Sequence, residues 1–286
     1  MLQGARHVQV FVAAGSCQRP PVPLLLWRRS RRALSDVTFV SDKGTDAGAC
    51  DSPAAPCRSF KFALGQTSPG GEIKALNPAD YGGVTITRGI SITGVEGAGI
   101  NSTSGSDITI NAGPNDAINL SHLILDGGMT ASIGIVLSSG GSLTVTNCVV
   151  RNFADVGVQL SPTANTTFLI QDTVVSGNNV GVSASSQGVG TDQGALDNVS
   201  VEENGHGIFV GAHANVLAVN SAVNDNAASG FDVFNGGVLR LTHSAVTGNS
   251  QGIIVIAGST AVSAGNNVIR GNGTDVTGTL TFVGTQ

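Results

Sequence analysis

Apolar and polar positions form a short sequence motif that recurs about every 23 residues over residues 133–255. In each copy a glycine is followed by an apolar, a variable and a second apolar residue, as in Gly207-Ile208-Phe209-Val210. The repeat glycines are Gly134, Gly157, Gly181, Gly207, Gly230 and Gly252, which lie 22 to 26 residues apart. Self-similarity at such a period is typical of a solenoid. Any candidate motif must therefore be distinguished from one more copy of the repeat.

A second series of polar residues runs in step with these glycines. One position is held by His122, Asn147, Asp172, Asn198, Asn220, His243 and Asn266. A further asparagine follows in most copies, at Asn178, Asn204, Asn226, Asn249 and Asn272. Asn and Gly tolerate the left-handed backbone conformation that tight corners need. Each period is therefore predicted to form two or three short strands separated by Asn/Gly corners, and an Asn column is expected to hydrogen-bond along its own stack.

The length of the period selects the fold class. A strand–helix–strand unit needs roughly 30 residues or more, so a period of about 23 residues is too short for it. The same length accommodates one three-sided coil of β-strands with small aliphatic residues inside. One coil cannot bury its own faces, so stability has to come from stacking. The pattern predicts an all-β parallel β-helix, a solenoid of about nine coils, over residues 71–286.

Residues 37–70 are expected to form an N-terminal cap. Phe60, Ala63 and Leu64 share one helical face, which predicts a short capping helix over the open end of the solenoid, where bare strands would invite aggregation. Cys50 and Cys57 bracket a proline-containing loop. Two cysteines so placed are expected to form a disulfide if the protein is exported.

Residues 1–36 differ from the rest in composition. They hold six of the fourteen basic residues and a single acid, Asp36. The apolar stretch Val8–Ala14 is short even for a signal peptide, and Arg28–Arg32 follow a second apolar stretch rather than precede it. We interpret residues 1–36 as a disordered or leader segment. A degenerate export signal and a functional basic arm are the alternatives.

The charge of the remaining chain excludes some partners. Residues 37–286 carry eight basic and eighteen acidic residues, a net charge of −10. Phosphate contacts need Lys and Arg, so no nucleic acid is expected as a partner. No apolar run reaches the roughly 18 residues that span a membrane, so no membrane span is expected.

The segment between residues 38 and 94 resembles a known family. The matching stretches are Thr38–Ser41, Gly44–Asp46, Cys50, Pro56–Phe60, Gly70–Ile73, Asp80–Thr87 and Ile90–Gly94. They are similar to the start of bacterial right-handed parallel β-helix repeat proteins of the pectin-lyase-like superfamily, and more loosely to pectinesterases. The resemblance covers roughly residues 37–283. It implies right-handed coils and a secreted or cell-surface protein that binds or acts on extended polysaccharides.

Two short motifs match enzymes of this superfamily but also fit the repeat. Gly205-His206-Gly207 resembles an element of polygalacturonase-like hydrolases, whose other catalytic elements are absent. Gln171-Asp172-Thr173 resembles an element of pectinesterases, and Asp172 stands in the polar column. We interpret Asp172, and likewise His122 and His243, as rungs of an Asn-type ladder.

The repeat alone does not explain a group of acidic residues. Glu203 and Asp225 each precede a corner asparagine, where other copies have Gly177, Gly248 and Gly271. On adjacent coils the two carboxylates would lie about 5 Å apart. Close carboxylates raise one pKa, as in the acid/nucleophile pair of a retaining glycosidase. Ca²⁺ binding and a solvated acidic corner are the alternatives.

The candidate catalytic residues are therefore Glu203 and Asp225, with His206 nearby. Candidate substrate-binding residues are Glu202, which adjoins them, and Phe209 and Asp232, which alternation places on an outer face. The insertion at residues 185–194 is the best candidate for a cleft wall. No metal and no cofactor are expected, apart from the Ca²⁺ alternative.

Three functions remain open at the level of sequence. The first is an exported, non-catalytic surface or matrix protein that binds glycans or other proteins along its β faces. The second is a divergent polysaccharide hydrolase or lyase. The third is a scaffold whose C-terminal end docks another protein chain. The absence of Trp beyond residue 36, the single Tyr81 and the few basic residues favour the first.

Overall fold

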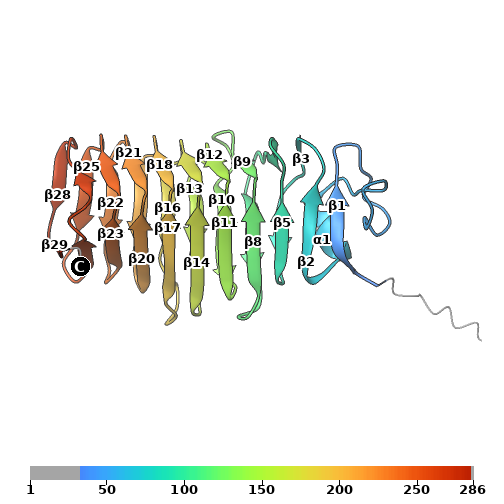
Figure 1. Cartoon of the computed structure of the whole chain (residues 1–286), viewed down its shortest axis with the longest axis horizontal. Coiled ribbons are helices and arrows are strands. Elements are labelled where there is room, and N and C mark those ends of the chain that lie inside the picture. The colour runs from blue at the N-terminus through green and yellow to red at the C-terminus, as the bar shows by residue number, and fades with distance from the viewer. Residues whose placement is uncertain (1–32, 285–286) are drawn as a thin grey trace, which may run out of the picture. The chain divides into compact units, whose positions relative to one another are not determined.

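The computed structural model describes residues 33–284, so the predicted leader, residues 1–36, lies almost wholly outside the described residues. Over residues 34–284 the chain winds into a right-handed parallel β-helix, in which successive coils add strands to three parallel sheets (Figure 1). The predicted fold class is confirmed. The solenoid has about eight turns, close to the nine coils expected.

The strands of each sheet are far apart in sequence and adjacent in space. Sheet A contains β1 (Ser35–Val40), β2 (Thr67–Ala75), β5 (Ile90–Thr93), β8 (Ala117–Ser121), β11 (Ser142–Thr146), β14 (Thr166–Gln171), β17 (Asp192–Asp197), β20 (Ala214–Val219), β23 (Val238–Thr242), β26 (Thr260–Ser263) and β29 (Leu280–Phe282). Sheet B contains β3 (Ala79–Asp80), β6 (Ala98–Ile100), β9 (Ile124–Asp126), β12 (Val149–Arg151), β15 (Val174–Ser176), β18 (Ser200–Glu202), β21 (Ala222–Asn224), β24 (Ala245–Thr247) and β27 (Val268–Ile269). Sheet C contains β4 (Val84–Ile86), β7 (Ser106–Asn111), β10 (Ile133–Ser139), β13 (Val156–Leu160), β16 (Val180–Ala184), β19 (His206–Val210), β22 (Ser229–Val233), β25 (Gln251–Val255) and β28 (Thr274–Thr277).

The apolar slots of the repeat stack in register inside the solenoid. Ile208 pairs with Val182 on the preceding coil and with Phe231 on the following one, and all three are buried. Each such side chain contributes roughly 1.5–3 kcal/mol by its burial. Because strand residues alternate between faces, Phe209, which follows Ile208, points outward. The core is thus built coil by coil, and the outer faces carry the variable residues.

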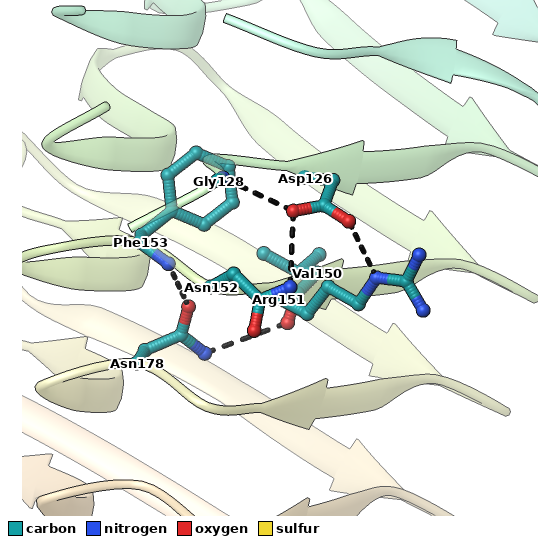
Figure 2. A network of polar contacts seen from close by, with 7 residues as sticks. All are labelled: Asp126, Gly128, Val150, Arg151, Asn152, Phe153 and Asn178. Carbon is teal, nitrogen blue, oxygen red and sulfur yellow. Dashed lines mark hydrogen bonds and ion pairs between the residues drawn. The ribbon is translucent and has the colours of Figure 1, made fainter. Parts of the chain in front are cut away.

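A continuous asparagine ladder runs through the corner between sheets B and C. Each side-chain amide donates from Nδ2 to Oδ1 of the asparagine on the next coil, at 2.9–3.0 Å, along Asn178, Asn204, Asn226, Asn249 and Asn272. The last of them, Asn272, donates to Oδ1 of Asp275. At the start of the ladder Oδ1 of Asn178 accepts the backbone N–H of Phe153 at 2.9 Å (Figure 2). The prediction of a hydrogen-bonded Asn column is correct for this column.

The other polar column is not a continuous ladder: Asp172 and His243 each bond to the asparagine on the next coil, as expected, whereas His122 forms no side-chain bond with the described residues. These residues are exposed corners between sheets A and B with positive φ, from 48° to 56°. Their side chains bond only in places, as where Nδ2 of Asn198 donates to Asp172 at 2.7 Å. The column is polar because Asn, Asp and His are the non-glycine residues that best tolerate the left-handed region.

The repeat glycines allow the coils to approach closely at the start of sheet C. A Cβ on Gly181 would lie 2.7 Å from the carbonyl oxygen of Gly207 and 2.7 Å from Cγ1 of Val201. The glycine is therefore required by packing between coils. Asp107 and Asp275 stand in the same column, one coil before the first repeat glycine and one coil after the last.

The N-terminal end carries the predicted capping helix. Helix α1 (Phe60–Gln66) begins after Ser59, whose hydroxyl accepts the N–H of Phe62, and it buries Phe60, Ala63 and Leu64 as expected. Cys50 and Cys57 form the predicted disulfide. Figure 1 shows α1 beside β1 and β2, at the end of the solenoid where the coils begin. Within residues 33–284 no helix is long and apolar enough to cross a membrane.

Candidate functional site

Glu203 and Asp225 occupy the corner between sheets B and C. Both have left-handed backbone, with φ of 57° and 54°, at a position that Gly177 and Gly248 hold in other coils. Both are exposed, and they follow the paired residues Glu202 and Asn224 on adjacent coils. Oδ1 of Asp225 lies where a Cβ on Gly248 would be, so this carboxylate leans toward the following coil. The prediction that Glu203 and Asp225 act as a catalytic pair stays a prediction.

Glu202 is the last residue of β18 on sheet B, immediately before that corner. Its Oε2 accepts a hydrogen bond from the hydroxyl of Ser200 on the same strand at 2.9 Å. Glu202 is therefore held along sheet B. Its predicted part in substrate binding is untested.

His206 and Asp232 are brought together on the outer face of sheet C. Nδ1 of His206, on β19, lies 3.0 Å from Oδ2 of Asp232 and 2.9 Å from Oγ of Ser229, both on β22. The Ser229 hydroxyl donates to the same Oδ2 at 2.5 Å. The side chain of His206 is 38% exposed and that of Asp232 15% exposed, while Ser229 is buried. We call these three residues the His206 cluster.

The contacts of the His206 cluster fix the orientation of the imidazole. Among the described residues, every hydrogen bond of the ring goes through Nδ1. The neutral ring therefore carries its proton on Nδ1 and leaves Nε2 as an acceptor. A held imidazole beside a carboxylate can accept a proton, donate one when charged, or bind a hydroxyl group.

Two phenylalanine rings flank the cluster. Phe209 follows His206 on β19, and the two rings meet edge to face with centroids 5.0 Å apart. Phe234, just after β22, meets Phe209 edge to face at 5.8 Å. Both phenylalanines are half-buried. The sequence indicated Phe209 by alternation but not Phe234 or Ser229, whose proximity depends on the register between coils.

A groove that sequence analysis did not identify crosses the outer face of sheet A. It has a volume of about 640 Å³. We call it the sheet A groove. Its exposed or half-buried lining side chains lie on β14, β17, β20 and β23, and they are Thr167, Gln193, Ala195, Asn215, Leu217 and Arg240. A smaller groove of about 310 Å³ continues it and shares Thr167 and Gln193. The sequence signal that could have identified the groove is the alternation of apolar and polar residues in each strand, which marks the lining residues as outward-facing.

The insertion predicted as a cleft wall ends earlier than expected. Residues 185–191 form the loop, and Asp192 begins β17. Thr191, the last residue of this loop, lines the smaller groove. The loop thus adjoins the sheet A groove, while His206 lies on sheet C.

A third groove, of about 500 Å³, follows the corner between sheets A and B. Asn147, Asp172, Asn198 and Asn220 line it, with Thr173 and Ser200 among their neighbours. The pectinesterase-like motif at Asp172 therefore lies on the surface. Its carboxylate accepts a hydrogen bond from Asn198, as a structural interaction of the column would.

Arg151 and Asn152 hold Asp126 near the start of the ladder, on sheet B. Burial raises the pKa of Asp126, but hydrogen bonds from Asn152, the Gly128 N–H and Arg151 outweigh it and keep the pKa below its ordinary value (Figure 2). The arrangement joins two coils through a charged network, and Asp126 is ionised at neutral pH.

Two other carboxyl groups are buried without partners. Asp107 and Asp192 are almost fully buried, and none of their carboxyl oxygens forms a hydrogen bond of ordinary geometry with the described residues. Burial raises the pKa of Asp192 to about 7. Burial also raises the pKa of Asp107 to about 7, although Ser102 lies close enough to oppose the shift.

The Ca²⁺ alternative for the acidic corner requires a cluster of oxygen ligands. In residues 33–284 no group of three or more His, Cys, Asp or Glu side chains is placed to hold a metal ion. Ca²⁺ prefers six to eight oxygen ligands. A Ca²⁺ ion held by the described residues would therefore need backbone or amide oxygens beside at most two carboxylates.

Comparisons with known proteins agree with this architecture. The family model described as the right handed beta helix region matches residues 188–273. The crystal structure of pectate lyase Pel9A superposes with a TM-score of 0.60 at 15% identity, over 87% of this chain and 77% of that one. The A-module of the Azotobacter vinelandii mannuronan C-5 epimerase AlgE4 superposes with a TM-score of 0.45 at 17% identity, over 68% of this chain and 67% of that one. No curated protein sequence matches the chain.

These likenesses concern the fold. The family model covers the central and C-terminal coils, and the pectate lyase shares the course of the chain at low sequence identity. The chain folds as a right-handed parallel β-helix, as the resemblance in its sequence implied.

Proposed function

We propose that this protein is an exported, non-catalytic binding protein for extended polysaccharides, and that the sheet A groove holds the polysaccharide chain. The observation that carries the proposal is the lining of this groove. Two amides, a hydroxyl and a guanidinium face one channel that crosses four parallel strands. With strands about 4.8 Å apart, four strands span about 14 Å, which suits an extended chain rather than a compact ligand.

The chemistry of the groove fits a hydroxyl-rich ligand that carries an acidic group. Gln193 offers both donors and acceptors to sugar hydroxyls, and Asn215, whose Oδ1 accepts a hydrogen bond from Arg240, offers its amide N–H groups. Arg240 is the only basic residue of the groove and can bind a carboxylate through two N–H groups. Leu217, 38% exposed, offers an apolar contact. The negative charge of the whole chain opposes an acidic polymer only weakly, because charges beyond about 8 Å are largely screened at physiological salt.

A polysaccharide panel tests this function. The full chain is incubated with immobilised polygalacturonate, alginate, xylan and β-glucan, and the soluble fraction is assayed for new reducing ends and new unsaturated uronates. We expect retention on an acidic polysaccharide without new products. The absence of retention on every acidic polysaccharide would contradict the proposal, as would the appearance of cleavage products.

Export is supported by the Cys50–Cys57 disulfide, because such bonds form and persist in oxidising compartments. The sequence resemblance to exported β-helix proteins points the same way. Fractionation of the producing cells tests this part of the proposal. We expect the protein in the medium or on the cell surface, and a protein confined to the cytosol would contradict export.

A second candidate function is cleavage of a polysaccharide at the corner that carries Glu203 and Asp225. It is favoured by one observation, that both exposed carboxylates stand on adjacent coils at a position otherwise held by glycine. His206 begins the strand that follows Glu203. A general acid and a nucleophile or base could be drawn from these three residues.

The cleavage function predicts a specific loss of activity. If the panel gives new reducing ends or unsaturated products, the double variant Glu203→Gln, Asp225→Asn should reduce the rate by at least about 100-fold, the lower range for one acid–base group. The matched control is Asp155→Asn, another exposed acid on the surface. Activity that survives in the double variant would rule out this pair as the catalytic residues.

A further inference from the structure

The His206 cluster and its two phenylalanines lie on sheet C, while the sheet A groove lies on another sheet. We infer that His206, Asp232, Phe209 and Phe234 form a second carbohydrate site, which binds a neutral sugar ring. The site goes beyond the proposed function, because it lies on a different sheet from the sheet A groove, consists of other residues and binds an uncharged ligand.

The first support is an apolar surface beside polar groups. Phe209 points outward between Ser183 and Asp232, its register partners on the neighbouring coils. Its edge-to-face contacts with His206 and Phe234 hold the ring in place. An aromatic ring offers a large apolar surface with little conformational freedom to lose. The C–H face of a sugar ring is apolar in the same way, so the two surfaces match.

The second support is the set of polar atoms that the cluster leaves available. Oδ2 of Asp232 is bonded to both Ser229 and His206, while Oδ1 and the Nε2 of His206 take no hydrogen bond from the described residues. Both side chains are partly exposed. Two acceptors held at a fixed separation suit two neighbouring hydroxyl groups of a sugar. Because Ser229 already locks them, little entropy is lost on binding.

The third support is charge, which selects the class of sugar. No Lys or Arg occurs between Arg151 and Arg240, while this stretch holds eight acidic residues, among them Asp232. A uronate would meet the Asp232 carboxylate without a cation to balance it, and like charges at such a site disfavour binding. A neutral sugar meets no such penalty. The sheet A groove contains Arg240 and therefore favours an acidic sugar over a neutral one.

Titrations of the full chain with soluble oligosaccharides test the inference. Neutral β-glucan, xylan and mannan oligosaccharides and an oligogalacturonate are added in turn, and heat of binding is measured. Phe209→Leu keeps an apolar side chain but removes the ring, and Asp232→Asn removes the charge. Phe282→Ala is the matched aromatic control, because Phe282 is an exposed phenylalanine on β29 of sheet A. Arg240→Ala is the control for the groove.

The expected result is binding of at least one neutral oligosaccharide, weakened about tenfold or more by Phe209→Leu and unchanged by Phe282→Ala and Arg240→Ala. The inference is overturned if no neutral oligosaccharide binds, if Phe209→Leu binds like the parent, or if Phe209→Leu weakens only the oligogalacturonate. Circular dichroism shows whether Phe209→Leu folds. If it does not fold, unchanged binding by Asp232→Asn overturns the inference and weakened binding supports it.

Discussion

The carboxyl group of Asp192 lies inside the solenoid at the first position of β17, 1% exposed and with both oxygens unpartnered among the described residues. Its pKa is raised from 3.8 in an ordinary environment to about 7, and burial is the sole cause. Between these two values the unfolded chain releases a proton that the folded chain retains. Raising the pH from about 4 to about 7 therefore favours the unfolded chain, and the effect is complete above pH 7.

Removal of this charge should stabilise the protein at alkaline pH. We expect Asp192→Asn to match the parent near pH 4 and to exceed its free energy of unfolding at pH 8 by at most about 4 kcal/mol, which is about three pKa units at 1.4 kcal/mol each. Urea denaturation at both pH values measures this. The exposed control Asp155→Asn should show no such growth with pH. Equal stability of Asp192→Asn and the parent at both pH values would show that Asp192 is not buried as an acid.

At the scale of single residues, alignment of the repeat singled out unusual residues but not their surroundings. Glu203 and Asp225 stood out because glycine holds their position in other coils, and the structure gives a conformational reason, a left-handed backbone. Asp107 and Asp192 gave no signal. Whether a carboxyl group points inward or outward depends only on which residues of a short strand face the core. For Asp192 the insertion at residues 185–191 hides this alternation, because it separates Asp192 from the aligned part of the repeat.

The asparagine ladder is the element in which the sequence pattern and the structure correspond most directly. From Asn204 onward, each ladder oxygen accepts both the backbone N–H and the side-chain N–H of the preceding asparagine, as Oδ1 of Asn226 does from Asn204 at 3.1 and 3.0 Å. The side-chain amides thus point the same way along the stack. The last N–H groups, on Asn272, meet Asp275, whose charge complements the donor end of the array.

Interruption of the ladder should be costly, because its members are buried. Asn226→Leu leaves the backbone N–H of Asn204 without its acceptor, and it removes one hydrogen bond each from the Asn204 side-chain amide and the Val201 carbonyl. At about 1–3 kcal/mol for the unsatisfied group and about 0.5–1.5 kcal/mol for each lost bond, we expect a loss of roughly 2–6 kcal/mol in the free energy of unfolding, measured by urea denaturation. Asn220→Gly, at an exposed corner with one side-chain bond, should cost less than about 1 kcal/mol. Similar losses in the two variants would mean that the ladder is not a source of stability.

Elements set by local sequence were predicted more accurately than contacts between coils. Helix α1 and the Cys50–Cys57 disulfide depend on spacings of a few residues. The contact of His206 with Ser229 and Asp232 depends on which residue of β19 faces which residue of β22. Insertions of one to three residues between copies shift that alignment. For this reason the sequence indicated His206 and Asp232 separately, without their contact.

For the whole molecule, the period of the sequence determines the architecture because each coil repeats the same strands and corners. The three sheets, the core and the corners all follow from one sequence motif with its glycine and asparagine positions. The sheet A groove does not follow from it. Its lining residues come from outward positions on four strands roughly 23 residues apart, and the repeat leaves these positions free to vary. Outward variation is where a solenoid places its binding surfaces.

Calorimetric titration of an acidic oligosaccharide into the Arg240→Ala and Arg270→Ala variants tests the central claim most directly. Each variant loses one exposed cation, but only Arg240 lines the sheet A groove. The loss of a charge-assisted hydrogen bond worth about 1.5–3 kcal/mol should weaken binding by roughly 10- to 100-fold in Arg240→Ala and leave Arg270→Ala near the parent. Equal affinities in the two variants would contradict binding of an acidic polysaccharide in this groove.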